Sequence, residues 1–136
     1  VEKLPDEFGG LSSLSYLNME NSRLTTLPET FGKLKSLKEI NARASSITDF
    51  PSSFGQLDGL LKLDFNYSKL KKFPVEICAL KAVNNVILNG TNLGRLPDEI
   101  YSMRSGVIFT LYQCLNMDYD QLKEITAKRD GLVFYY

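Results

Sequence analysis

The sequence has 136 residues, enough for one domain, and its 16 basic and 16 acidic side chains cancel. Zero net charge gives no electrostatic basis for binding nucleic acid, and no stretch reaches the ~18 consecutive apolar residues of a membrane span. There is no histidine, which excludes Ser-His and Cys-His catalytic pairs and imidazole-bound metals. We therefore expect no enzymatic activity, no cofactor and no metal.

The prolines are the most informative feature of the sequence, because each lies 23 residues after the last. They are Pro5, Pro28, Pro51, Pro74 and Pro97. A fixed period in the twenties is typical of a solenoid, in which each repeat is one supersecondary unit. Apolar residues keep the same period, and one such column is Leu17, Ile40, Leu63, Val86 and Phe109.

Each repeat is predicted to hold one short strand and one helical turn. Residues 16–20 and their equivalents alternate outward polar with inward apolar residues, as a half-buried strand does. Stacked repeats would place these strands in parallel at about 4.8 Å spacing. After the prolines, acidic residues at Asp6, Glu29 and Asp98 and the glycines at positions 9, 32 and 55 favour a short helical or 3₁₀ turn on the opposite side. One repeat cannot bury both its apolar faces, so stability must come from stacking.

The repeat reads LxxLxLxx(N)xL followed by xxLPxxFxxL, and from Val1 to about Cys114 it resembles the leucine-rich-repeat family. Its 23-residue LPxxFGxL form is similar to Ras-suppressor and Scribble-type repeats and to repeats of bacterial effector proteins. The resemblance implies an α/β solenoid with a parallel concave sheet of about five strands. In the family, an Asn bonds the backbone inside the turn after each strand. That column here reads Ser22, Ser45, Ser68, Thr91 and Cys114, so we expect a looser ladder.

Residues 1–117 are predicted to be the repeats, and residues 118–136 a C-terminal capping helix and tail of the same domain. Val1 falls in the column of Leu24, so the sequence starts within a repeat and we expect it to belong to a longer chain. DYDQLKEITAKR predicts an amphipathic helix, begun by a capping box of Asp118 and Gln121. The apolar tail from Leu132 is predicted to pack on the last repeat. This ending is similar to the cap of bacterial effectors that carry a novel-type E3 ligase domain.

The two cysteines, Cys78 and Cys114, occupy unrelated columns of the repeat, which predicts two free and inert thiols. Free thiols suit a reducing compartment, so we expect a cytoplasmic location or delivery into a host cytoplasm. Neither cysteine lies in the Cys-x-Asp motif of the effector ligases, so that activity is not carried over. The two Asn-x-Ser/Thr motifs, at Asn66 and Asn89, are produced by the repeat itself.

The outward positions of the strands vary, whereas the inward ones repeat. Exposed aromatic and aliphatic side chains are typical of interfaces, so we predict a binding site for an unidentified protein partner on the concave face. The predicted site residues are Tyr16, Glu39, Arg43, Lys62, Asp64, Asn66, Tyr67, Ile87, Asn89 and Tyr112. A merely soluble strand face is the simplest alternative. Two functional alternatives are the substrate-recognition domain of an effector-type ubiquitin ligase whose catalytic domain is absent, and an extracellular ligand receptor domain.

Overall fold

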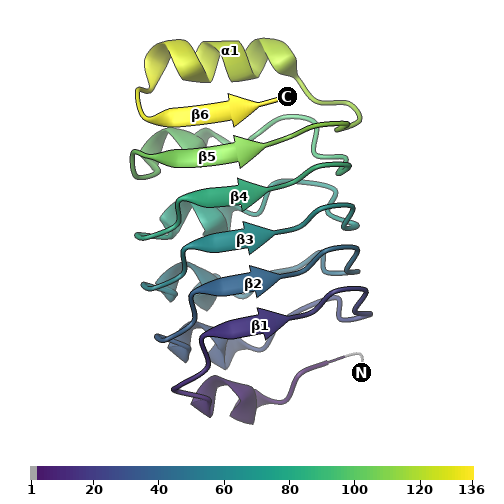
Figure 1. Ribbon diagram of the computed structural model, residues 1–136, viewed down its shortest axis with the longest axis vertical. Coiled ribbons are helices and arrows are strands. Elements are labelled where there is room, and N and C mark those ends of the chain that lie inside the picture. The colour runs from purple at the N-terminus through teal and green to yellow at the C-terminus, as the bar shows by residue number, and fades with distance from the viewer. Residues whose placement is uncertain (1–2) are drawn as a thin grey trace.

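The computed structural model describes residues 3–136, so the placement of Val1 lies outside the described residues. The predicted α/β solenoid is confirmed. Its strands form one parallel sheet in chain order (Figure 1). They are β1 (Tyr16–Asn18), β2 (Glu39–Asn41), β3 (Lys62–Asp64), β4 (Asn85–Ile87), β5 (Val107–Thr110) and β6 (Leu132–Tyr135). We expected about five strands, and the described chain has six.

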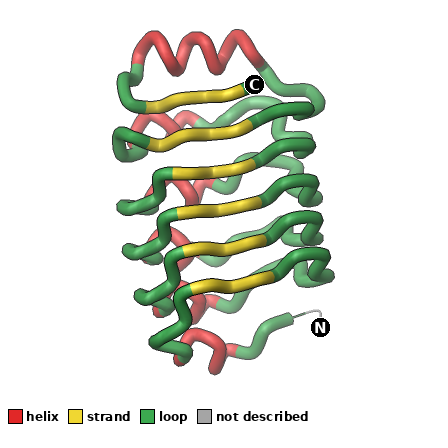
Figure 2. The backbone as a smooth tube through the Cα atoms, in the orientation of Figure 1, coloured by secondary structure: helices red, strands yellow, loops and turns green. Residues whose placement is uncertain are grey.

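A short 3₁₀ turn follows each of the five prolines, as predicted. The turns are η1 (Asp6–Gly10), η2 (Glu29–Lys33), η3 (Ser52–Gln56), η4 (Val75–Ala79) and η5 (Asp98–Ser102). Each proline is the residue before its turn and has extended backbone, which starts the turn without requiring a proline N–H. The turns form the layer behind the sheet (Figure 2).

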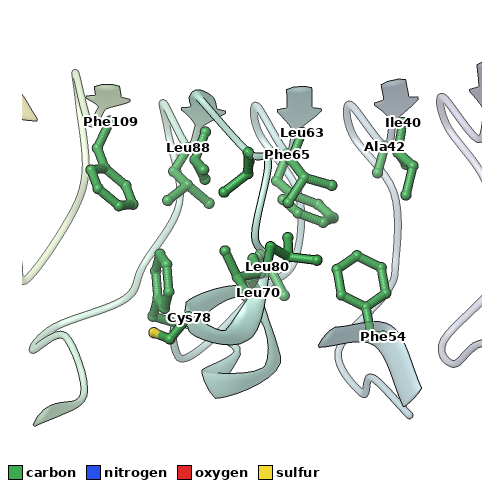
Figure 3. Close-up of a cluster of buried hydrophobic side chains, with 14 of the residues drawn as sticks. Ile40, Ala42, Phe54, Leu63, Phe65, Leu70, Cys78, Leu80, Leu88 and Phe109 are labelled. Carbon is green, nitrogen blue, oxygen red and sulfur yellow. The ribbon is translucent and has the colours of Figure 1, made fainter. Parts of the chain in front are cut away.

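The core fills the space between the strands and the turns (Figure 3). The strand register aligns equivalent residues, so that Leu17 pairs with Ile40 and Ile40 with Leu63. On the turn side, the Phe31 ring stacks on Phe8 at 6.1 Å and on Phe54 at 5.9 Å between centroids. Each repeat thus buries its apolar side chains against the next one, as the period requires.

Consecutive 3₁₀ turns approach closely, and a glycine stands at the point of contact. A Cβ atom at Gly32 would fall on the Ser53 carbonyl oxygen and 2.7 Å from Ser53 Cβ. The Ser53 hydroxyl donates to the Glu29 carbonyl (2.7 Å) and accepts from the Gly32 N–H (3.2 Å), which holds the two turns together. In the first three turns the glycine of this column, at Gly9, Gly32 and Gly55, is therefore required by close packing against the next turn.

The turn after each strand is held less uniformly than in an Asn ladder. Ser22 Oγ accepts from the Leu24 N–H at 3.0 Å, and Thr91 Oγ1 donates to the Leu88 carbonyl at 2.6 Å. The hydroxyls of Ser45 and Ser68 are buried and have no hydrogen-bond partner. The looser ladder expected from this column is thus found at the two central repeats, which lack the side-chain bond altogether.

The C-terminal helix α1 (Tyr119–Lys128) begins as predicted, with the Gln121 N–H donating to Asp118 Oδ1 at 3.0 Å. The capping box is not completed, because the Gln121 side chain turns into the core. Its Oε1 accepts from the Leu96 N–H and its Nε2 donates to the Leu96 carbonyl, both at 2.7 Å. Gln121 therefore supplies the last repeat with backbone partners.

The tail from Leu132 does pack on the last repeat, but it does so as strand β6. Leu132 pairs with Val107 and Tyr135 with Thr110, and the Phe134 ring stacks on Phe109 at 4.9 Å. This is the strand that the count of about five omitted. The tail has no repeat proline or turn of its own, so the 23-residue period gave no reason to expect a strand there.

The Gly32→Ala substitution should destabilise the fold by about 1–3 kcal/mol, because the new methyl group would overlap backbone of the adjacent turn. Gly10→Ala is the matched control, since a Cβ at Gly10 meets nothing within 4 Å. Urea unfolding followed by circular dichroism measures both. Equal stability of the two variants would show that the turns are not in tight contact.

The Gln121→Leu substitution should cost about 2–4 kcal/mol, because it leaves the N–H and carbonyl groups of Leu96 without their side-chain partner in a buried position. Lys123→Leu, at an exposed position of the same helix, should change the unfolding free energy by less than about 0.5 kcal/mol. If the two variants have the same melting temperature, the hydrogen bonds of Gln121 are not what closes the solenoid.

Candidate binding face

The outward side chains of the sheet form three rows across the strands. The first row is Tyr16, Glu39, Lys62, Asn85, Ile108 and Val133, and the second is Asn18, Asn41, Asp64, Ile87, Thr110 and Tyr135. The third follows the strand ends and contains Glu20, Arg43, Asn66, Asn89 and Tyr112. Nine of the ten predicted site residues lie in these rows, and Tyr67 lies directly beyond the third. We call this surface the sheet face. Sequence reasoning missed Val133 and Tyr135, because β6 was not expected.

Charged residues on the sheet face pair with each other between neighbouring strands. Lys62 Nζ lies 3.5 Å from Glu39 Oε1, and Arg43 Nε lies 3.7 Å from Glu20 Oε1. All four side chains are well exposed, so each pair adds at most about 1 kcal/mol to stability. Their main effect is to cancel charge on this part of the face.

Amide and carboxylate side chains of the face hold the turns that follow the strands. Asp64 Oδ1 accepts from the Asn66 N–H at 2.9 Å, two residues further on. Asn66 Oδ1 accepts from the Asn89 N–H (2.9 Å), and Asn89 Oδ1 from the Tyr112 N–H (2.7 Å), each on the next repeat. These three predicted site residues thus have a structural task, which leaves the amide NH₂ groups of Asn66 and Asn89 for a partner.

Tyr67 lies in the left-handed backbone region, with φ of 56°. Its equivalents are also left-handed, namely Asn21, Ala44, Gly90 and Gln113. The Arg43 guanidinium carbon lies 4.9 Å from the centroid of the Tyr67 ring, and the ring also packs against Gly90. A Cβ at Gly90 would lie 2.6 Å from Tyr67 Cε1, so the glycine makes room for the ring. Asn21 and Gly90 were the sequence signal for this conformation.

Tyr67 is 49% exposed although its ring contacts Arg43 and Gly90. A large side chain in a left-handed conformation is unfavourable by roughly 1–2 kcal/mol, and Asn or Gly would avoid that energy. In return the fold gains a cation–π contact of about 0.5–1 kcal/mol and the contact of the ring with Gly90. Strained exposed residues of this kind are frequent at binding sites.

The cysteines lie outside the sheet face, and both are free and buried. Burial, with the Glu99 and Glu76 carboxylates nearby, raises the pKa of the Cys78 thiol to about 12. A buried thiol with a raised pKa stays protonated at neutral pH, and a protonated thiol is a poor nucleophile and a poor metal ligand. Within residues 3–136, no three His, Cys, Asp or Glu side chains gather in a way that could hold a metal ion. No helix of that range has the length and apolar character to cross a membrane.

Comparisons with known proteins agree with this architecture. The family model described as Leucine Rich Repeat matches residues 13–34. A comparison with curated protein sequences gives no match. Among solved structures, a leucine-rich-repeat protein of Leptospira interrogans is 28% identical with a TM-score of 0.69, over 85% of this chain and 33% of its own. The plant peptide hormone receptor RGFR1, in complex with RGF2, is 25% identical with a TM-score of 0.62, over 79% of this chain and 19% of its own. This chain thus spans a third or less of either structure.

Tyr67→Asn should be more stable than Tyr67→Ala by about 1 kcal/mol, because both remove the ring but only Asn suits a left-handed backbone. The same two substitutions at Tyr16, an exposed residue of strand β1, provide the control and should differ little. Urea unfolding of the four variants tests this. Indistinguishable Asn and Ala variants at position 67 would remove the argument that Tyr67 is strained.

Proposed function

We propose that this chain, a leucine-rich-repeat solenoid, recognises a partner protein through its concave sheet face. Leucine-rich-repeat domains are commonly protein–protein interaction modules and are typically not enzymes, and both the family match and the fold belong to that class. The observation that carries the proposal is the set of exposed tyrosine and isoleucine side chains on a face where the solenoid needs none. Inward columns stay apolar because packing requires it, whereas the outward rows carry no such requirement.

Tyr67 and Arg43 form the centre of the proposed interface. They follow strands β3 and β2 in the sequence. These two strands lie between β1 and β4 in the sheet (Figure 1). Tyrosine and arginine are the residue types that most often carry interface energy, and such residues concentrate near the middle of an interface. The Arg43–Tyr67 contact limits the rotamers of both side chains before a partner arrives, which lowers the entropy lost on binding.

Two further observations support this proposal. The plant receptor of similar fold was solved in complex with RGF2, which makes recognition of a polypeptide compatible with such a solenoid. We also propose a cytoplasmic location for this interaction, which the two free, buried thiols support because free thiols suit a reducing compartment.

Tyr67→Ala and Arg43→Ala should each weaken binding of a purified partner by about 2 kcal/mol, or roughly 30-fold in Kd, at a stability within about 1 kcal/mol of wild type. Lys33→Ala and Gln56→Ala, exposed on the 3₁₀ turns, are the controls and should leave Kd unchanged. Affinity capture identifies the partner, and isothermal titration calorimetry then measures Kd. Weakening by the turn variants, with no effect of the sheet-face variants, would place the interface on the opposite side.

A further inference from the structure

The sheet face is divided into two chemically different halves. All of its charged side chains lie on the repeats of β1–β3, namely Glu20, Glu39, Arg43, Lys62 and Asp64. Four of these form the two ion pairs between strands, and Asp64 accepts a backbone hydrogen bond. The charges of the N-terminal half are thus already satisfied within the chain.

The C-terminal half of the face, over β4–β6, has no charged side chain among its outward residues in the described chain. It carries instead Ile87, Ile108, Tyr112, Val133 and Tyr135, which we call the C-terminal apolar patch. Ile108 and Val133 are direct neighbours in the β5–β6 register, and Ile87 and Tyr135 lie on either side of Thr110. The patch is therefore continuous across three strands, on the order of 10 Å wide at the usual strand spacing.

Four of these five side chains are well exposed in the folded chain, and Ile87 is half-buried. Val133 is 40% exposed and Tyr135 48%, and Ile108 and Tyr112 are exposed to a similar degree. Their strand neighbours Phe109 and Phe134 point inward and stack on each other, so the core is complete without the patch. A polar residue at any of the outward positions would leave this packing intact. The apolar character of the patch thus has no structural cause within the described chain.

We infer that the C-terminal apolar patch anchors an uncharged segment of the partner protein that carries aliphatic or aromatic side chains. This inference rests on the proposed function and specifies which half of the sheet face selects the partner. Charge complementarity favours such a segment, because a charged side chain buried against the patch would lose its hydration and find no opposite charge there. The neutral polar groups beside the patch, the amides of Asn85 and Asn89, would hydrogen-bond backbone groups of the bound segment at its edge, with the Asn89 NH₂ donating to a backbone carbonyl.

A random dodecapeptide library displayed on phage is a suitable probe, because it offers apolar, acidic and basic sequences to the intact chain at once. We expect the selected peptides to share two or three aliphatic or aromatic positions without charged residues between them. As synthetic peptides they should bind with a Kd that changes less than about twofold between 0.05 and 0.5 M NaCl, since few charges are involved. Their binding should show a negative heat-capacity change, the mark of apolar burial.

Two sets of variants locate the peptide site. Ile108→Asp and Val133→Asp should reduce the affinity of the selected peptides at least 10-fold. Lys33→Ala and Gln56→Ala, exposed on the 3₁₀ turns and outside the sheet face, should change it less than twofold. Circular dichroism and thermal melts confirm that each variant is folded, and Ile108→Ser and Val133→Ser replace any aspartate variant that is not.

Three results would overturn the inference while leaving the proposed function standing. The first is selection of charged peptides whose binding is salt-sensitive, and the second is failure of the library to enrich any sequence. The third is a wild-type dimer that Val133→Asp converts to a monomer, because a second copy of the chain would then occupy the patch. Selected peptides that are insensitive to every sheet-face substitution would overturn the inference. If the purified partner is equally insensitive to Tyr67→Ala and Arg43→Ala, the proposed function fails as well.

Discussion

Each repeat of this solenoid depends on its neighbours to satisfy its backbone. The Lys38 N–H donates to the Ser15 carbonyl of the repeat before it, and the Lys38 carbonyl accepts from the Leu61 N–H of the repeat after it, both at 2.8 Å. Buried backbone groups without such partners are strongly unfavourable, so a repeat is stable only when stacked. This requirement keeps equivalent residues in register and fixes the 23-residue period. It also requires that the last repeat be closed by something other than a further repeat.

The C-terminal cap meets that requirement and also extends the proposed binding surface. Gln121 bonds the backbone of Leu96, and β6 supplies partners for β5, as in the bond from the Leu111 N–H to the Tyr135 carbonyl (2.7 Å). The same strand places Val133 and Tyr135 on the sheet face. Closing the stack and enlarging the apolar patch are thus achieved by one segment, which links the stability of the C-terminal end to the function proposed for it.

The inward part of the structure could be predicted from the sequence, because packing repeats the same residue types at the same positions. Leu17, Ile40 and Leu63 fix both the strands and their register. Features decided by single contacts could not be predicted. The side chain of Gln121 could complete a capping box or bond the neighbouring repeat, and its position in three dimensions decides between the two. The same holds for Asn66 and Asn89, whose amides look free in the sequence but hold the next repeat.

We propose that the partner is recognised by the sheet face and not by the layer of 3₁₀ turns. Mapping backbone and methyl NMR shifts of the labelled chain, with and without the purified partner, tests it most directly. We expect shift changes at residues of the sheet face, strongest from β3 to β6, with the signals of the 3₁₀ turns η1–η5 unchanged. Changes concentrated on the turns, with the sheet face unaffected, would contradict it.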